Sequence, residues 1–300
     1  MPGLNLHIYP SAIRFESRMM RITGSLADKG LFDEIHLVGV WEEGLPEEER
    51  IDDIRTIHRI RLSGLWKKLG GMGRIGKLLE WNFKFVRRYR GRPVAMINPH
   101  IVWALPGTAW LARRWNAVHL YDTHELETET HASRGLRKKL SKFIERRYYQ
   151  TLDATVVVSP GIGAWYEQHY PGIPIHTLKN YPLKKAEPVV PAPLKEQFGI
   201  APGDQLFIYQ GRLSRGAIID LLLAVFAELP PSKHLLFLGF GPYQEAVREL
   251  ARTRANIHYH PAVPFDQVPP ITSAADAAFA LFQDTCLSYH HVLPNKLWKP

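Results

Sequence analysis

The chain has 300 residues, of which 45% are hydrophobic, and a formal net charge of +9. This length and apolar content suit two α/β units that each bury a core, and they argue against one small domain. The single cysteine, Cys286, excludes an internal disulfide and fits a reducing compartment such as the cytosol. No window approaches 18 uncharged apolar residues, and the first residues lack a secretory pattern, so we expect neither a spanning helix nor export.

The first part of the chain alternates short apolar runs with amphipathic helical patterns. This alternation is typical of βα units that build a mostly parallel sheet. It predicts one Rossmann-like unit over residues 1–181. The expected strands are 4–9, 34–40, 94–98, 117–122, 154–159 and 174–178, and the expected helices are 16–30 and 135–152.

Residues 61–92 are strongly basic, with ten lysines and arginines against the single acidic residue Glu80. Leucine and aromatic residues are interleaved with these charges. The pattern indicates a basic amphipathic element that could lie on an anionic membrane surface, or simply a solvated helix face above ordinary core contacts. Since no nucleic-acid motif accompanies the charge, we expect no nucleic-acid partner.

Within this segment, GMGRIGKL (71–78) imitates a glycine-rich phosphate loop. Leu78 stands where such a loop needs a hydroxyl for magnesium, and no strand precedes the glycines. We therefore predict a flexible turn at this point and no nucleotide site.

Residues 182–195 contain four prolines, which is too many for a helix or a central strand, and they predict an extended linker. The alternation of strands and helices then restarts and predicts a second α/β unit over 196–300. Only four strands are expected before residue 300, fewer than a complete open sheet of this kind usually has. The expected strands are 205–211, 234–239, 256–260 and 276–282, and the expected helices are 217–229 and 242–253.

The most informative polar run is AVHLYDTHELETETH, where a predicted strand ends at Asp122 and is followed by His124 and Glu125. Side chains at the carboxyl edge of a parallel strand face the crevice where ligands bind. A histidine there can exchange a proton near neutral pH, and a carboxylate can orient it. A polar loop capped by Asp122 is an alternative. A metal site is another, although the spacing fits no standard ligand pattern.

Several motifs in their order along the chain resemble glycosyltransferase family 4, also called glycosyltransferase group 1, whose members have the GT-B fold. YDTHELETE is similar to the family's D-x-H-E segment, and Arg18 stands where the first helix of the family commonly has an arginine. VVVSPGIG resembles its "VS-x-G-I" turn. YQGRLSRG resembles the phosphate-binding turn of the donor domain, and FLGFGPYQ the G-x-G-P segment beside the nucleotide.

The resemblance implies two Rossmann-like domains, the second incomplete: an acceptor-side domain (1–181), a linker (182–195) and a partial sugar-nucleotide-binding domain (196–300). It implies a glycosyltransferase of hexosyltransferase type. Such an enzyme moves a sugar from a nucleoside diphosphate sugar to a saccharide or lipid-linked acceptor. No cofactor and no metal are expected, because basic side chains and a helix terminus stabilise the leaving diphosphate.

The resemblance also implies the site residues and the cellular setting. Asp122, His124 and Glu125 are the candidates for catalysis or positioning at the acceptor side. We expect a role in cell-surface polysaccharide or glycolipid synthesis, in the cytoplasm or on the inner face of the membrane. The candidates for donor binding are Gly211, Arg212, Arg215, Gly239, Gly241, Asn295 and Lys296.

The sequence departs from the family pattern at a pair of glutamates eight positions apart, the second of which holds the donor ribose. After the run PNKLW (294–298), Lys299 takes that place, and His291 stands eight positions earlier. A lysine has no acceptor for ribose hydroxyls. We expect a truncated chain or a fragment. The alternative is a non-catalytic GT-B protein that binds a ligand but has lost the ribose carboxylate.

Overall fold

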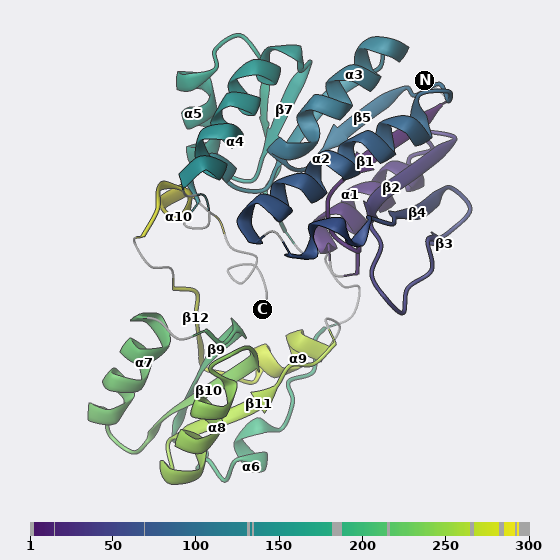
Figure 1. Ribbon diagram of the computed structural model, residues 1–300. Coiled ribbons are helices and arrows are strands. Elements are labelled where there is room, and N and C mark those ends of the chain that lie inside the picture. The colour runs from purple at the N-terminus through teal and green to yellow at the C-terminus, as the bar shows by residue number, and fades with distance from the viewer. Residues whose placement is uncertain are drawn as a thin grey trace. The chain divides into compact units, whose positions relative to one another are not determined.

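The structure is a computed structural model, and it divides into two compact units, Met1–Asn180 with Thr285–Leu293, and Tyr181–Asp284 with Pro294–Pro300 (Figure 1). The units are described separately. The backbone is described for residues 3–14, 16–68, 70–130, 133, 135–181, 188–214, 217–264, 267–281, 285–291 and 293, without the side chains of 67, 68, 70–72 and 217.

The first unit is built on one eight-stranded sheet with the order β3-β4-β2-β1-β5-β6-β7-β8. All neighbouring pairs are parallel except β3 with β4. The six strands that the sequence predicts are present. The short polar pair β3 and β4 adds to them at one edge. The strands are β1 (Leu4–Ile8), β2 (Glu34–Val40), β3 (Glu48–Arg50), β4 (Arg55–Ile60), β5 (Met96–Pro99), β6 (Val118–Thr123), β7 (Ala154–Val157) and β8 (Ile175–Thr177).

Helices cover both faces of this sheet (Figure 1). On one face α2 packs beside α3, and α3 packs beside α4. Alternation along β1 sends Leu4, Leu6 and Ile8 into the core under α2, while Asn5 and His7 lie on the opposite face. The helices are α1 (Ser17–Asp28), α2 (Gly70–Tyr89), α3 (Leu105–Trp115), α4 (Gly135–Tyr148), α5 (Pro160–His169) and α10 (Leu287–His291), with 3-10 turns η1 (Gly64–Lys68), η2 (Val102–Ala104), η3 (Glu127–Glu129) and η4 (Tyr149–Thr151).

The glycine-rich stretch 71–78 lies inside α2, so the predicted turn is wrong. A Cβ on Gly76 would overlap the ring of Trp66 from η1, which means that this glycine lets the indole pack directly on the helix. Trp81, Phe85 and Tyr89 then bury the inner face of α2. Tertiary packing therefore overrides the low helix propensity of glycine here.

The second unit contains a four-stranded parallel sheet with the order β11-β10-β9-β12 among the described residues. Phe226 on α7 and Phe237 on β10 belong to the core on one face of this sheet. Its elements are α6 (Leu194–Gln197), β9 (Gln205–Arg212), α7 (Ala217–Glu228), β10 (Lys233–Phe240), α8 (Gln244–Thr253), β11 (Ile257–Pro261), α9 (Val268–Ser273) and β12 (Ala277–Phe279).

In the part of the chain that the structure describes, every helix is too short or too polar to cross a bilayer.

Candidate functional site

The topology of the first sheet brings three strand ends together. The chain runs outward from β1 to β2 on one side and continues through β5 and β6 on the other, so the strand order reverses at β1. Ligands of open α/β sheets bind outside the carboxyl ends of the strands at such a reversal. Tyr9 follows β1, His100 follows β5, and β6 ends with Asp122 and Thr123.

Asp122 is a buried carboxylate that Arg18 of α1 holds. The Arg18 guanidinium donates from Nη2 to Oδ1 at 2.7 Å and from Nε to both oxygens at 3.2 Å. The two side chains are only 6% and 4% exposed. Arg18 also donates from Nη1 to the carbonyl of Leu178 at 2.8 Å, which ties α1 to the chain that follows β8. The arginine suggested by the family pattern is therefore paired with the carboxylate that the D-x-H-E segment supplies.

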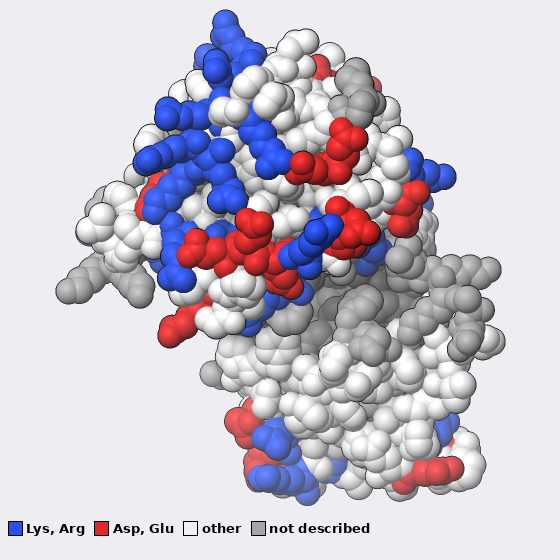
Figure 2. Space-filling view, turned by 90° about the vertical axis from the view of Figure 1, so that its right-hand side faces the viewer, with Lys and Arg blue, Asp and Glu red and all other residues white. Residues whose placement is uncertain are grey.

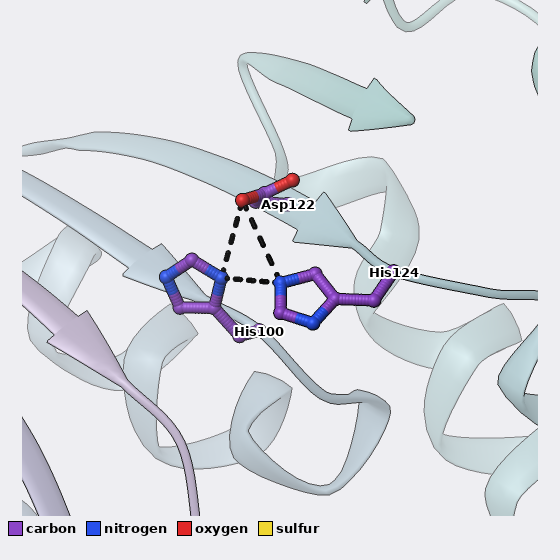
Figure 3. A group of neighbouring side chains, drawn as sticks. All are labelled: His100, Asp122 and His124. Atoms are coloured by element: carbon purple, nitrogen blue, oxygen red, sulfur yellow. Dashed lines mark hydrogen bonds and ion pairs between the residues drawn. The ribbon is translucent and has the colours of Figure 1, made fainter. Parts of the chain in front are cut away.

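Two histidines face the other side of the same carboxylate (Figure 3). Nδ1 of His100 lies 3.2 Å from Oδ2 of Asp122, and Nε2 of His124 lies 3.8 Å from it. Burial alone would raise the pKa of Asp122, but the lowering effects of its neighbours, the hydrogen bond with His100 first among them, outweigh burial and hold the pKa well below 3.8. Burial lowers the pKa of His100, so this ring is neutral near pH 7. Asp122 is thus an ionised acceptor for its neighbours.

A cavity of about 140 Å³ lies beside this cluster. Glu127 contributes one wall and accepts from the amide of Val102 at 2.9 Å. Burial raises the pKa of Glu127 well above its ordinary value, and the nearby carboxylates Glu125 and Glu145 add to the effect. A raised pKa widens the pH range in which the carboxyl group holds a hydrogen that it can donate to a ligand hydroxyl. The lining residues are Tyr9, His100, Ile101, Trp103, His124, Glu125, Glu127, Thr130, Ser133, Arg137 and Ser141.

His100, Asp122 and His124 each present one potential metal-ligand atom, and these atoms lie within 4.8 Å of one another. The donor set does not suit a cation, however, because the Arg18 guanidinium already binds the same carboxylate at 2.7 Å. A divalent ion would lie next to this fixed positive charge, and it would have to displace the hydrogen that His100 shares with Asp122.

In the second unit, the four predicted donor residues that the structure describes lie at or just after the ends of β9 and β10. Gly211, Arg212 and Gly239 line a cavity of about 190 Å³ together with residues of β10 and the segment after β11. Arg212 is exposed, and within the described residues its guanidinium has no ion-pair partner. Of the other candidates, Arg215, Asn295 and Lys296 lie outside the described residues.

The glycines at this edge have a packing role that the sequence did not indicate. A Cβ on Gly239 would overlap the carbonyl oxygen of Gly211, and a Cβ on Gly241 would overlap that of Leu213. Their φ values of 155° and 153° are also unfavourable for other residues. Whatever ligand approaches them, these glycines first allow the backbones of two neighbouring strands to come close together.

The sequence did not single out His100, His7 or Asn5 as site residues. His7 Nδ1 lies 2.9 Å from His100 Nε2, and His100 Nδ1 lies 3.1 Å from His124 Nε2. The available signal was an unusual one. Polar residues occupy alternate positions in or just after two predicted strands, Asn5 and His7 in 4–9, and Asn98 and His100 at the end of 94–98. Buried polar side chains in such strands need partners, and these residues find them in one another.

Solved structures with the same fold are glycosyltransferases. Sucrose-phosphate synthase from Thermosynechococcus elongatus superposes with a TM-score of 0.65 at 14% identity, over 92% of this chain and 74% of that one. Anabaena HepE in complex with UDP and glucose gives 0.61 at 14% identity, over 92% and 73%. The lipopolysaccharide outer core galactosyltransferase WaaB gives 0.57 at 11% identity, over 89% and 70%. The architecture is therefore that of the GT-B enzymes, and the chain spans about three quarters of the length of these structures.

The model of Glycosyltransferase Family 4 matches residues 16–180, more than half of the chain. The chain belongs to this family and is a glycosyltransferase. No curated protein sequence gives a significant match.

Proposed function

We propose that the chain transfers a sugar from a nucleoside diphosphate sugar, with UDP as the nucleotide, to a saccharide or lipid-linked acceptor in cell-surface polysaccharide or glycolipid synthesis. The UDP donor is suggested by the HepE complexes with UDP and with UDP-glucose. The acceptor class is suggested by WaaB, which acts on lipopolysaccharide outer core. The proposed setting is the cytoplasm or the inner membrane face.

The observation that carries this proposal is the pairing of a family 4 domain with a polar cavity at the strand reversal, lined by His124, Glu125 and Glu127. Its hydroxyl-binding groups suit a sugar better than an apolar ligand. In the second unit, Arg212 beside Gly211 and Gly239 offers a diphosphate a cation that has no ion-pair partner among the described residues. A guanidinium stabilises the charge that develops on the leaving diphosphate, so no metal is required in this proposal.

Calorimetric titration with UDP and UDP-glucose tests the donor assignment. We expect binding that persists in EDTA, and an Arg212→Ala variant that binds UDP at least tenfold more weakly and loses roughly 10²–10³ in transfer rate, as for other single charge-stabilising donors. Arg252→Ala, on the exposed side of α8, is the matched control and should bind as the parent does. Equal UDP affinity in the two variants would remove Arg212 from the site.

We propose that a smaller surface docks to an anionic membrane than the whole basic segment 61–92. Several cations of 61–92 pair with carboxylates of the neighbouring strands and helix: Arg61 with Glu47, Arg88 with Glu48, Arg92 with Glu34, and Lys84 with Glu80. Blue and red side chains accordingly lie side by side on the amino-terminal unit (Figure 2).

One stripe of α2 keeps the properties that a membrane contact needs. Leu79 and Phe83, which are 58% and 67% exposed, recur four residues apart, and Arg87 continues the same face. Within the described residues, neither Arg87 nor Arg90 has an ion-pair partner. Apolar side chains beside free cations are the combination that binds anionic lipid surfaces.

Sedimentation with phosphatidylserine-containing vesicles tests this surface. We expect binding that falls at high salt, and a loss of more than tenfold in Phe83→Ser/Arg87→Glu. Arg248→Glu/Arg252→Glu on α8 removes two exposed arginines from the other unit, one more than the α2 variant removes, and should leave binding unchanged. A membrane contact through α2 is refuted if the two double variants sediment alike.

A further inference from the structure

A row of four buried polar side chains leads from the interior of the first sheet to His124. Asn98 of β5, Asn5 and His7 of β1, and His100 are each at most 3% exposed. Consecutive members are joined by hydrogen bonds. None of them touches the cavity except His100, and the donor and acceptor assignments above do not use the other three.

A backbone carbonyl fixes the direction of this row. The amide group of Asn98 lies 3.1 Å from the carbonyl oxygen of Leu6, which can only accept, so the Asn98 atom there is the nitrogen. The same nitrogen donates to Asn5, whose facing atom is therefore the oxygen Oδ1. The amide nitrogen of Asn5 is then the atom 3.4 Å from Nε2 of His7, and it donates to that ring. His7 consequently accepts at Nε2.

The direction continues through the two buried rings. Burial holds the pKa of His7 well below its ordinary value, so the ring is neutral and carries its single hydrogen on Nδ1. That hydrogen is donated to Nε2 of His100 over 2.9 Å. His100, which is also neutral, then carries its hydrogen on Nδ1 and directs it to the ionised carboxylate of Asp122 at 3.2 Å. The carbonyl of Leu6 at one end can only accept, and so can the ionised Asp122 at the other. Both ends therefore require the same order of donors and acceptors along the row.

This direction determines what His124 can do. Nε2 of His124 lies 3.1 Å from the protonated Nδ1 of His100 but 3.8 Å from Oδ2 of Asp122, beyond hydrogen-bond distance (Figure 3). A hydrogen on Nε2 would therefore face the hydrogen of His100 without an acceptor of its own. We propose that the row Asn98–Asn5–His7–His100 fixes neutral His124 as the tautomer with its hydrogen on Nδ1, so that this ring meets its ligand as a hydrogen-bond donor and not as a base. Within the described residues, no protein group accepts from Nδ1 of His124, and its side chain is 27% exposed beside the cavity.

The proposed tautomer of His124 has two consequences: it argues against a role as a base and against a metal site. A ring that presents N–H cannot take a proton from an acceptor hydroxyl through that atom, but it can bind a sugar oxygen. This point, and only this one, rests on the proposed function. In addition, Nδ1 of His100 has no lone pair to offer, so the cluster of His100, Asp122 and His124 does not bind a metal in this state.

The test is long-range ¹H–¹⁵N correlation of the histidine rings in the whole ¹⁵N-labelled protein near pH 7.5, with His124→Gln to assign the signal. We expect His124 to show a protonated Nδ1 and an unprotonated Nε2, with no change on addition of Zn²⁺. An Nε2-protonated ring, an equal mixture, or a zinc-dependent shift would overturn the proposal. The spectrum needs no substrate, so failure of UDP binding would sink the proposed donor and leave this result standing.

Asn5→Asp tests the row itself, because it replaces a donating amide by an oxygen of the same shape that only accepts. We expect His124 to lose at least half of its Nδ1-protonated signal to the other tautomer. Asn256→Asp makes the same change in the second unit, where Asn256 donates to the carbonyl of Phe226, and should leave His124 unchanged. A folded Asn5→Asp variant with an unaltered His124 would refute the role of the row. If that variant does not fold, the parent spectrum still decides.

Discussion

In the proposed function, His124 would meet the acceptor through one nitrogen, Nδ1, which points away from Asp122 and His100. Its neighbours already use Nε2. The value of the residue to a substrate is therefore that of a positioned N–H group, which a glutamine amide can imitate and an alanine cannot.

We expect His124→Gln to retain sugar transfer within about tenfold of the parent, and His124→Ala to lose roughly 10²–10³, the usual effect of removing one positioned donor. Initial rates with saturating donor measure both. If His124 acted as a base, the two variants would be equally impaired, since neither side chain can take up a proton.

Arg18 and Asp122 form a buried ion pair at the site. Arg18→Met leaves an ionised carboxylate without its principal partner, and breaking a buried pair in this way costs about 3–5 kcal/mol of unfolding free energy. Urea unfolding at pH 7 measures it. Arg248→Met removes an exposed pair with Glu245 and should cost less than about 1 kcal/mol. If both variants lose a similar amount of unfolding free energy, solvent must reach and stabilise the Asp122 carboxylate after Arg18 is removed.

The sequence predicts those site residues that stand at the end of a predicted strand. Asp122 and His124 end a predicted strand and start a loop, which is where ligands are bound in such sheets. His7 and His100 lie 93 positions apart, and only the pairing of β1 with β5 shows that they touch. The alternation of Asn5 with His7 indicates buried polar side chains that need partners, but it does not show which residues those partners are.

At the scale of the elements, the ends of β9 and β10 lie too close together for a side chain at Gly239. Gly239→Ala would place a Cβ against the carbonyl oxygen of Gly211 at a φ of 155°. We expect a loss of about 1–3 kcal/mol from overpacking and a weaker hold on UDP. Hydrogen exchange of the β9 and β10 amides, with urea unfolding, checks this. Gly203→Ala, with nothing within 4 Å of the new methyl, is the control.

Most strands follow from hydrophobic periodicity, whereas the helices α3 and α5 and the strands β3 and β4 were not among the predicted elements. The strands β3 and β4 escaped prediction because arginine and glutamate occupy them, and the pair Arg59–Glu49 at 2.6 Å replaces apolar contacts. The start of α2 was not predicted because its glycines suggest a turn. In the structure, Gly76 leaves space for the ring of Trp66 to pack on the helix. In both cases the deciding partner is distant in the sequence or polar, and periodicity does not register such partners.

For the whole molecule, buried histidines govern the response to acid. His119 is 1% exposed, and burial lowers its pKa to about 4 in the folded state, against 6.5 when unfolded. The unfolded chain therefore takes up the proton first. The contribution of His119 to stability is complete above about pH 6.5 and declines as the pH falls to about 4. The loss is about 3 kcal/mol, since one pKa unit corresponds to about 1.4 kcal/mol.

Urea unfolding between pH 7 and 4 measures this decline. His36, His58 and His258, each with a pKa lowered by burial to about 4, act in the same direction. The slope should be shallower in His119→Gln, which stays neutral throughout, and unchanged in His176→Gln, where the histidine is exposed. An unaltered slope in His119→Gln would show that this ring takes up its proton without unfolding.

The hydrogen bond from Arg18 to the carbonyl of Leu178 connects the buried Asp122 to a segment of the chain near the surface. Arg18 donates a hydrogen bond to the residue before Lys179, and Arg21 donates one to the side chain of Asn180, the residue after it. Anything that draws Arg18 away from this segment should loosen the peptide bond on which trypsin acts after Lys179. Limited proteolysis at that single bond would then report on the charge of Asp122, a group that no protease can reach.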